Sequence, residues 1–432
     1  MLVDGQLLHG HAAVVDTDTF AEVGPLEQVR HHHRDLQPVT APSHLLMPGF
    51  VDAHHYLSQS FGTALAFGEP SEIFRRLWVP LEMTMSQEEL YASAKLAALE
   101  SIRGGFTTVA DAGTRSPHDL GILAAATEEV GLRCVLSAVC DDTAQEARST
   151  GEALTAAAAH LASVERWPLA HGSLAVSVPD AATEATLRGV VDLCRTEEVP
   201  LQVHVNEHLV AVERMLVGAG RRPLEYLDDV GAVGPWLLAA HATLLPQQEI
   251  LMLRDRGAAV SYNPVASAWK GNAVCPALTL AALGVRFGLG TDGTRSDAFR
   301  LLDAAEMAQR LTSAMGIGDP YAGSGRLWMG AATSGGADAV GLKEVTGRIA
   351  AGYAADFLLV DLAVPEFVST RDLVWELVRR GNRDQIKMVV VAGRPRMVDG
   401  QPLGWDAAAC VEEACKLAAT ATRRIGSGSD AE

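Results

Sequence analysis

The sequence predicts an α/β protein built as a (β/α)8 barrel, the TIM-barrel architecture, with a small β-sandwich formed by the N- and C-terminal segments. The first observation is that short, continuously apolar runs alternate with helical patterns between residues 48 and 344. Such runs are typical of a parallel sheet with helices on both faces, and eight strand–helix units close a barrel. The second observation is that residues 1–47 and 345–405 carry short alternating runs separated by turn signals.

Eight segments fit the strands of the barrel because each is short, apolar and bounded by polar or glycine-rich stretches. In chain order they are residues 49–54, 106–112, 133–139, 174–178, 201–205, 236–242, 258–262 and 285–290. Helical patterns fill the intervals between them. In residues 86–103, for example, Ser86 is suited to cap the helix, and the acidic first turn complements the helix dipole.

The outer segments predict an accessory domain. Residues 1–47 and 345–405 are expected to form one β-sandwich, in which residues 354–362 are a strand and residues 386–403 a hairpin around Gly393–Arg394. Residues 406–432 follow as a terminal helix and a small, polar tail that is expected to be disordered.

Composition narrows the class of protein. A net charge of −18 disfavours nucleic acid and anionic membranes as partners, and it suits a small neutral or cationic substrate. The six cysteines form no C-x-x-C pair, which favours buried free thiols in a reducing compartment. The first residues lack the features of a secretion signal, and no apolar run approaches the roughly 20 residues that cross a bilayer. A cytoplasmic, soluble protein without a nucleic-acid or membrane partner is therefore expected.

Polar residues stand where several predicted strands end, which is where a barrel carries its working residues. They are His54, Tyr56, His204, Glu207, His208, His241, Tyr262, Asn263 and Asp292. Imidazoles and a carboxylate converging on the barrel mouth suit Zn²⁺ or Fe²⁺, and such an ion supplies hydroxide at neutral pH. Each residue also has a structural explanation, as a hydrogen-bonded histidine or a helix-capping aspartate. Their occurrence at four separate strand ends favours a catalytic site.

Several motifs together resemble the amidohydrolase superfamily, and most closely its branch of S-adenosylhomocysteine/methylthioadenosine deaminases, 8-oxoguanine deaminase and triazine hydrolases. The resemblance covers nearly the whole chain. The motifs are MPGFVDAH (47–54), WVPLE (78–82), HVNE (204–207), AAHATLL (239–245), LGTDG (289–293) and GRIAAGYAADFLLVDL (347–362).

The resemblance implies a role for each matched residue. His54, His204 and Asp292 match metal ligands, and Asp292 also matches the base that takes a proton from the attacking water. His241 matches the residue that orients or polarises water and substrate. Glu207 matches the acid that protonates a ring nitrogen of the substrate.

Other positions depart from the family pattern and concern substrate binding. Glu82 matches a carboxylate that holds ribose hydroxyls in nucleoside-type deaminases, but Ser177 stands where those enzymes carry a substrate-binding histidine. Residues 262–264 read YNP in place of HCP, and ASAWKG (266–271) replaces the usual Ser-Asn-x-Lys. These changes disfavour a plain methylthioadenosine deaminase. The residues expected to shape the rebuilt substrate site are Gln59, Trp78, Glu82, Ser177, Tyr262 and Trp269.

The largest departure is Tyr56, which replaces the second histidine of the family's H-x-H motif. Four interpretations remain open at this point. In the first, the site still holds a metal, and His241 or Tyr56 replaces the missing ligand. In the second, it works without a metal, by acid–base chemistry through Tyr56, Glu207, His241 and Asp292. In the third, the protein is a non-catalytic binder, and in the fourth, Tyr56 merely fills volume while other groups act.

The sequence therefore predicts an amidohydrolase-type enzyme that hydrolyses a C–N bond of a small nitrogen heterocycle, by deamination or ring opening. Zn²⁺ or Fe²⁺ is the expected cofactor, with a metal-free site as the alternative. The alternative functions are metal-independent elimination, isomerisation or hydrolysis, and binding without catalysis. The family resemblance also implies a homodimer, for which the apolar segment 73–83 is a candidate contact.

Overall fold

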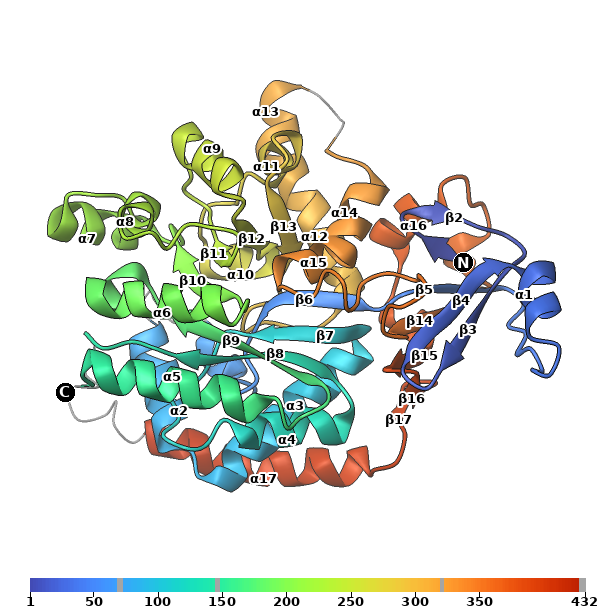
Figure 1. Ribbon diagram of the computed structural model, residues 1–432, viewed down its shortest axis with the longest axis horizontal. Coiled ribbons are helices and arrows are strands. Elements are labelled where there is room, and N and C mark those ends of the chain that lie inside the picture. The colour runs from blue at the N-terminus through green and yellow to red at the C-terminus, as the bar shows by residue number, and fades with distance from the viewer. Residues whose placement is uncertain (68–72, 144–147, 319–321, 427–432) are drawn as a thin grey trace.

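A computed structural model describes residues 1–67, 73–143, 148–318 and 322–426, and it shows a barrel with a smaller antiparallel sheet beside it (Figure 1). Eight parallel strands follow one another around the barrel in chain order. They are β6 (Phe50–His55), β7 (Phe106–Asp111), β8 (Arg133–Val139), β9 (Ala170–Val176), β10 (Leu201–Val205), β11 (Leu237–His241), β12 (Ala259–Tyr262) and β13 (Arg286–Leu289). All eight predicted strands are confirmed, although β9 begins four residues before the predicted start.

The ring closes where the first strand meets the last. The backbone N–H of Asp292 donates to the carbonyl oxygen of His54 at 2.8 Å, and His55 and Asp292 form a parallel bridge. Closure therefore brings the ends of β6 and β13, two segments more than 200 residues apart in the sequence, next to each other at the barrel mouth.

Most helices surround the barrel, whereas α1 packs on the β3–β4 hairpin away from it (Figure 1). The helices are α1 (Leu26–His32), α2 (Val79–Thr84), α3 (Gln87–Arg103), α4 (Gly121–Val130), α5 (Thr150–Val164), α6 (Glu184–Thr196), α7 (Leu209–Ala219), α8 (Pro223–Asp229), α9 (Gln247–Arg256), α10 (Pro264–Lys270), α11 (Ala277–Ala282), α12 (Ala298–Gln309), α13 (Met315–Ile317), α14 (Gly325–Ala331), α15 (Ser334–Ala339), α16 (Leu373–Arg380) and α17 (Ala407–Gly426). As predicted, Ser86 caps α3, and it forms a reciprocal capping box with Glu89.

Both chain ends contribute to the smaller sheet. In it β5 (His44–Pro48) pairs antiparallel with β14 (Phe357–Asp361), followed by β15 (Ile386–Val391), β16 (Arg394–Val398) and β17 (Gln401–Pro402). Two separate hairpins, β1 (Leu2–Val3) with β2 (Gln6–Leu7) and β3 (His11–Asp16) with β4 (Thr19–Pro25), complete this part of the molecule. The predicted hairpin turn lies at Ala392–Gly393, because Arg394 already begins β16.

A buried ion pair joins the sheet to the barrel. Arg133, the first residue of β8, donates from Nε to Asp356 at 2.9 Å. Asp356 also accepts from the Thr346 hydroxyl and from the backbone N–H of Ala392, both at 2.7 Å. This network fixes the sheet against the bottom of the barrel, opposite the catalytic end.

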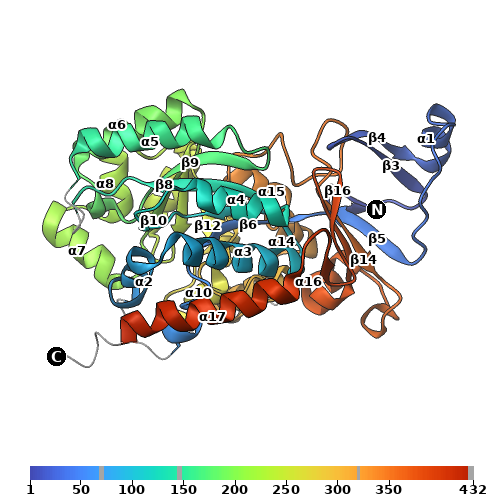
Figure 2. The same cartoon turned by 90° about the horizontal axis from the view of Figure 1, so that it is seen from below.

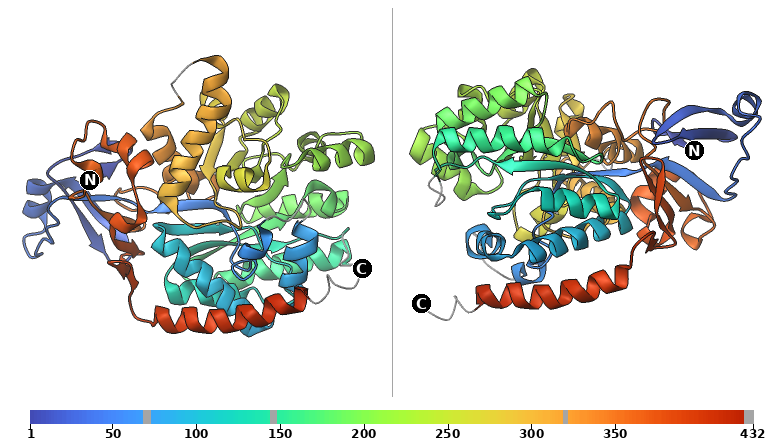
Figure 3. Two further views of the ribbon diagram at one scale, coloured as in Figure 1. Left: turned by 180° about the vertical axis from the view of Figure 1, so that it is seen from behind. Right: turned by 60° about the horizontal axis from the view of Figure 1, so that its bottom comes forward.

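The terminal helix α17 runs back from the small sheet along the outside of the barrel (Figure 2). It packs on α3 and α2, and its Arg424 contacts Glu89 on α3 (Figure 3). The predicted disordered tail beyond residue 426 lies outside the described residues. Among the helices of the described segments, none is long and apolar enough to cross a membrane.

Candidate active site

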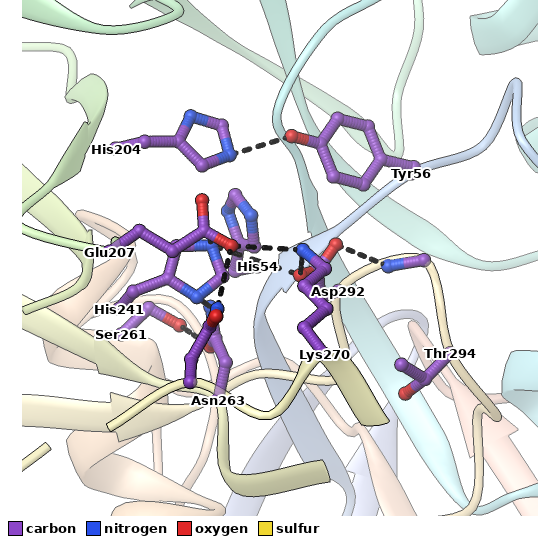
Figure 4. A network of polar contacts seen from close by, with 12 residues as sticks. His54, Tyr56, His204, Glu207, His241, Ser261, Asn263, Lys270, Asp292 and Thr294 are labelled. Atoms are coloured by element: carbon purple, nitrogen blue, oxygen red, sulfur yellow. Dashed lines mark hydrogen bonds and ion pairs between the residues drawn. The ribbon is translucent and has the colours of Figure 1, made fainter. Parts of the chain in front are cut away.

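The predicted catalytic side chains meet at the carboxyl ends of the barrel strands (Figure 4). His54 lies at the end of β6, His204 on β10 and His241 at the end of β11, while Glu207 and Asp292 follow β10 and β13. The backbone is left-handed at His241, with φ 69°, and at Asp292, with φ 58°. Residues with side chains rarely adopt this conformation, and active sites are among the places where it recurs.

Three of the imidazoles form a compact group. His54, His204 and His241 each place a ring nitrogen within 4.8 Å of the others. Within the described residues, both ring nitrogens of His54 and Nε2 of His241 are buried without a hydrogen-bond partner. Burial lowers the pKa of all three histidines, and that of His241 to about 4, so the rings are neutral and carry free lone pairs. Neutral imidazoles are ligands of metal ions, and His54 and His241 keep ring nitrogens without a partner, so this group can hold a metal ion.

The lone pair of His204 accepts a hydrogen bond from Tyr56. The Nδ1 of His204 lies 2.7 Å from the carbonyl oxygen of Ser177, which can only accept, so Nδ1 carries the ring proton. The Nε2 lone pair of His204 then accepts from the Tyr56 hydroxyl at 2.8 Å. Burial raises the pKa of Tyr56 well above its ordinary value, which keeps the phenol protonated. The residue that replaces the missing ligand histidine therefore engages the same nitrogen atom that a metal would use.

A second group joins His241 to two carboxylates. Glu207, His241 and Asp292 place one ligand atom each within 4.8 Å of one another, and His241 Nε2 lies 3.7 Å from a carboxylate oxygen of each acid. Burial alone would raise the pKa of both carboxyls, but the Nε2 edge of His241, which faces both acids, and the full positive charge of the Lys270 ammonium outweigh it and hold each pKa below its usual range. Both acids are therefore ionised.

Asn263 sets the orientation of His241. The Asn263 side-chain amide nitrogen faces His241 Nδ1 at 3.3 Å, and its amide oxygen accepts from the Ser261 hydroxyl at 2.7 Å. With the amide in this orientation, His241 accepts at Nδ1 and carries its proton on Nε2, toward Glu207 and Asp292. This arrangement suits a residue that orients water or substrate.

Three of the residues predicted to bind substrate, Gln59, Glu82 and Ser177, form hydrogen bonds within the protein. Glu82 is fully buried; its Oε1 accepts from Ser58 at 2.8 Å and from the Gln59 amide at 3.3 Å, and its Oε2 accepts from the backbone N–H of Arg115 at 2.9 Å. The Ser177 hydroxyl contacts Arg115 and Asp141. Trp78, directly before the helix α2 that contains Glu82, is buried as well.

Tyr262 does not join the site, contrary to the expectation from the sequence. Its hydroxyl donates to the carbonyl oxygen of Ala305 on α12 at 3.1 Å, and its ring lies near Trp328. Because side chains alternate along a strand, its neighbours Ser261 and Asn263 face the catalytic group instead. Trp269 lies at the surface, 47% exposed, with its ring against Phe67.

Sequence reasoning also missed two cations. Lys270 places its ammonium nitrogen 3.0 Å from Glu207 Oε1 and 2.8 Å from Asp292 Oδ2. Arg115 lies against Glu82, Asp141 and the ring of Phe74. Nothing in the local sequence distinguishes either residue, because their partners come from distant segments.

Comparison with known proteins extends this description. A model of the amidohydrolase family matches residues 45–396. A 5-methylthioadenosine/S-adenosylhomocysteine deaminase from Syntrophobacter fumaroxidans is 28% identical over 404 residues, which are 92% of this chain and 90% of that protein. A 5'-deoxyadenosine deaminase from Methanothermobacter thermautotrophicus is 30% identical over 367 residues, 83% of each protein.

Solved structures agree with these matches. An adenosine deaminase from Xanthomonas campestris with bound zinc has a TM-score of 0.87 at 27% identity, covering 97% of this chain and 94% of its own. A mutant atrazine chlorohydrolase from Arthrobacter aurescens, complexed with zinc and atraton, shares the fold with a TM-score of 0.82 at 18% identity, covering 95% of this chain and 96% of its own. The chain therefore belongs to the amidohydrolase family and is a hydrolase of carbon–nitrogen bonds.

Proposed function

We propose that this enzyme hydrolyses a C–N bond of a small nitrogen heterocycle, by deamination or ring opening. The observation that carries the proposal is the pairing of a neutral, partly unpartnered imidazole group with two ionised carboxylates at the mouth of the barrel. The substrates named for the relatives, 5-methylthioadenosine, S-adenosylhomocysteine and 5'-deoxyadenosine, each carry an amino-substituted nitrogen heterocycle.

The proposed proton path follows from the charge state of the two acids. Glu207 is ionised at rest, so it first takes a proton from the water that attacks the sp² carbon, and then passes it to the ring nitrogen. His241 orients the water through its Nε2 proton. Asp292 takes the second proton of the water and delivers it to the leaving amine. The C–N bond then breaks, a carbonyl forms and ammonia or an amine leaves.

A metal ion fits the donor set of this site. His54 and His204 would hold it together with the ionised Asp292, or with His241 after its proton moves from Nε2 to Nδ1, or with Tyr56 after the phenol loses its proton, and zinc and iron(II) both accept such ligands. When bound, the ion acts as a Lewis acid that lowers the pKa of a bound water to about 7. The hydrogen bond from Tyr56 to His204 favours a second candidate, in which the same acids and His241 perform the reaction without a metal.

Substrate choice is expected to differ from that of the nucleoside deaminases. Both oxygens of Glu82 already accept hydrogen bonds within the protein, and the side chain is fully buried. This supports a substrate without a ribose diol.

The test is a screen for ammonia or amine release across free heterocyclic amines and their nucleosides, with untagged protein analysed for bound metal. We expect turnover of a free heterocycle, and loss of at least a hundredfold in kcat in Glu207→Gln. A compound that binds tightly but is never turned over, with Glu207→Gln altering affinity alone, would contradict the proposal. The cytoplasmic location and the homodimer stay predictions, and light scattering of the purified protein tests the latter.

A further inference from the structure

We propose that Lys270 is a positioning residue of this active site, whose ammonium group holds the Glu207 and Asp292 carboxylates in the arrangement that proton transfer requires. The inference rests on the proposed function, because it gives these two acids their roles. The predicted metal ligands and acids give no role to Lys270, although its ammonium group lies between Glu207 and Asp292 (Figure 4).

The two oxygens of Glu207 have different surroundings. Oε1 accepts from Lys270 Nζ at 3.0 Å and from the Asn272 amide at 3.4 Å, and it lies 3.2 Å from His208 Nε2. Oε2 instead faces His241 Nε2, at 3.7 Å. Holding one oxygen on the protein side leaves the other directed at the reaction centre, which is the geometry that a proton shuttle needs.

Asp292 is held through both of its carboxylate oxygens, and Lys270 bonds the oxygen that faces His241. Its Oδ1 accepts from the backbone N–H of Gly293 at 2.5 Å, and its Oδ2 accepts from Lys270 Nζ at 2.8 Å. Two buried carboxylates whose oxygens lie within 4.8 Å of a shared imidazole repel each other. The single ammonium between them offsets that repulsion and sets their separation.

The local fold explains why Lys270 reaches both acids. It is the last residue of α10, and Gly271 then reverses the chain with φ 69°, a left-handed conformation suited to glycine. The reversal returns Asn272 to Glu207, while Asn263 at the start of α10 contacts His241. The segment 263–272 thus positions all three acid–base residues.

The first test is kinetic and uses the heterocyclic amine that the wild-type enzyme turns over fastest. We expect Lys270→Met to lower kcat about 100-fold, the scale of a small misplacement of catalytic groups, with KM changed less than threefold. Lys416→Met, which removes a lysine of the exposed Lys416–Glu412 pair on α17, serves as the control and leaves both constants unchanged.

Chemical rescue separates positioning from a general effect on folding. Lys270→Cys treated with 2-bromoethylamine regains a side chain of near-lysine length and charge, and we expect it to recover at least a tenth of wild-type kcat. Wild-type and Lys270→Met proteins treated identically show whether alkylation of the exposed Cys415 changes kcat by itself. Lys270→Cys before alkylation takes the place of Lys270→Met in the kinetic test if Lys270→Met does not fold.

A second measurement needs no substrate and uses zinc alone. Without the ammonium, the Glu207 and Asp292 carboxylates attract a divalent ion more strongly, so zinc affinity of Lys270→Met rises at least fivefold, and that of Lys270→Arg stays within twofold of wild type. An unchanged kcat and zinc affinity in Lys270→Met, or failure of the alkylated cysteine to recover, would overturn the inference. If Glu207→Gln also retained full activity, the proposed function itself would fail.

Discussion

Replacing Tyr56 by phenylalanine tests directly whether this residue is a metal ligand or a competitor of the metal. The phenol donates to His204 Nε2 at 2.8 Å, and the His204 proton on Nδ1 leaves that lone pair as the only one on the ring. A metal ion that binds His204 must therefore displace this hydrogen bond. In Tyr56→Phe there is nothing to displace, so zinc binding becomes stronger.

The size of the effect follows from the worth of one hydrogen bond. A buried bond of this kind contributes a net ~0.5–1.5 kcal/mol. Since 1.4 kcal/mol corresponds to tenfold in affinity, zinc is expected to bind Tyr56→Phe roughly 2- to 12-fold more tightly than wild type. In the metal-free protein, the same change lowers the free energy of unfolding by about 1 kcal/mol, because His204 Nε2 is left unpartnered.

Competition with a chromophoric chelator at pH 7 measures the zinc dissociation constant of the metal-free proteins. Tyr262→Phe is the matched control, because it removes another buried phenol, bonded to Ala305 and outside the catalytic group. Its zinc affinity should equal that of wild type. A drop of more than tenfold in the zinc affinity of Tyr56→Phe would show that the phenolate is a ligand, and the competitor interpretation would be wrong.

Three further predictions follow from the described contacts. Tyr56→His restores the family's H-x-H pattern, so elemental analysis should find more bound metal while the native activity falls; unchanged metal content would contradict this. Asp356→Asn disrupts the buried pair with Arg133, and we expect the free energy of unfolding in denaturant titration to fall by about 3–5 kcal/mol; a loss below 1 kcal/mol would contradict it. Burial, with a smaller contribution from Arg133, lowers the pKa of His171 to about 4, so the unfolded chain binds this proton first as the pH falls. Wild type should therefore lose up to about 3 kcal/mol more stability than His171→Gln between pH 6.5 and 4, and identical pH slopes would refute it.

The strand ends carried most of the predictable information. His54, His204, His241 and Asp292 were recognisable because each ends or follows an apolar run of strand length, and a barrel brings such ends together. Tyr262 lies outside the catalytic group because side chains alternate along β12, and its neighbours Ser261 and Asn263 hold the inward positions.

Contacts between distant segments could not be predicted from the sequence. Lys270 is ordinary in its own helix, and only the closure of the barrel brings it to Glu207, 63 residues earlier, and to Asp292. Glu82 was expected to be available to a substrate, but its partners Ser58 and Arg115 come from separate loops. Pairings of this kind depend on loop geometry, which residue patterns do not encode.

The pairing of β5 with β14 has a consequence for biosynthesis. The two strands are separated by about 310 residues, so a ribosome adding about 5–20 residues per second leaves the edge of β5 without its neighbour for roughly 15–60 s. Throughout that interval the nascent chain displays His44–Pro48 as an open β-edge of the kind that recruits other chains. Yield of soluble protein should thus depend on expression temperature and chaperone supply more steeply than the stability of the finished molecule would suggest.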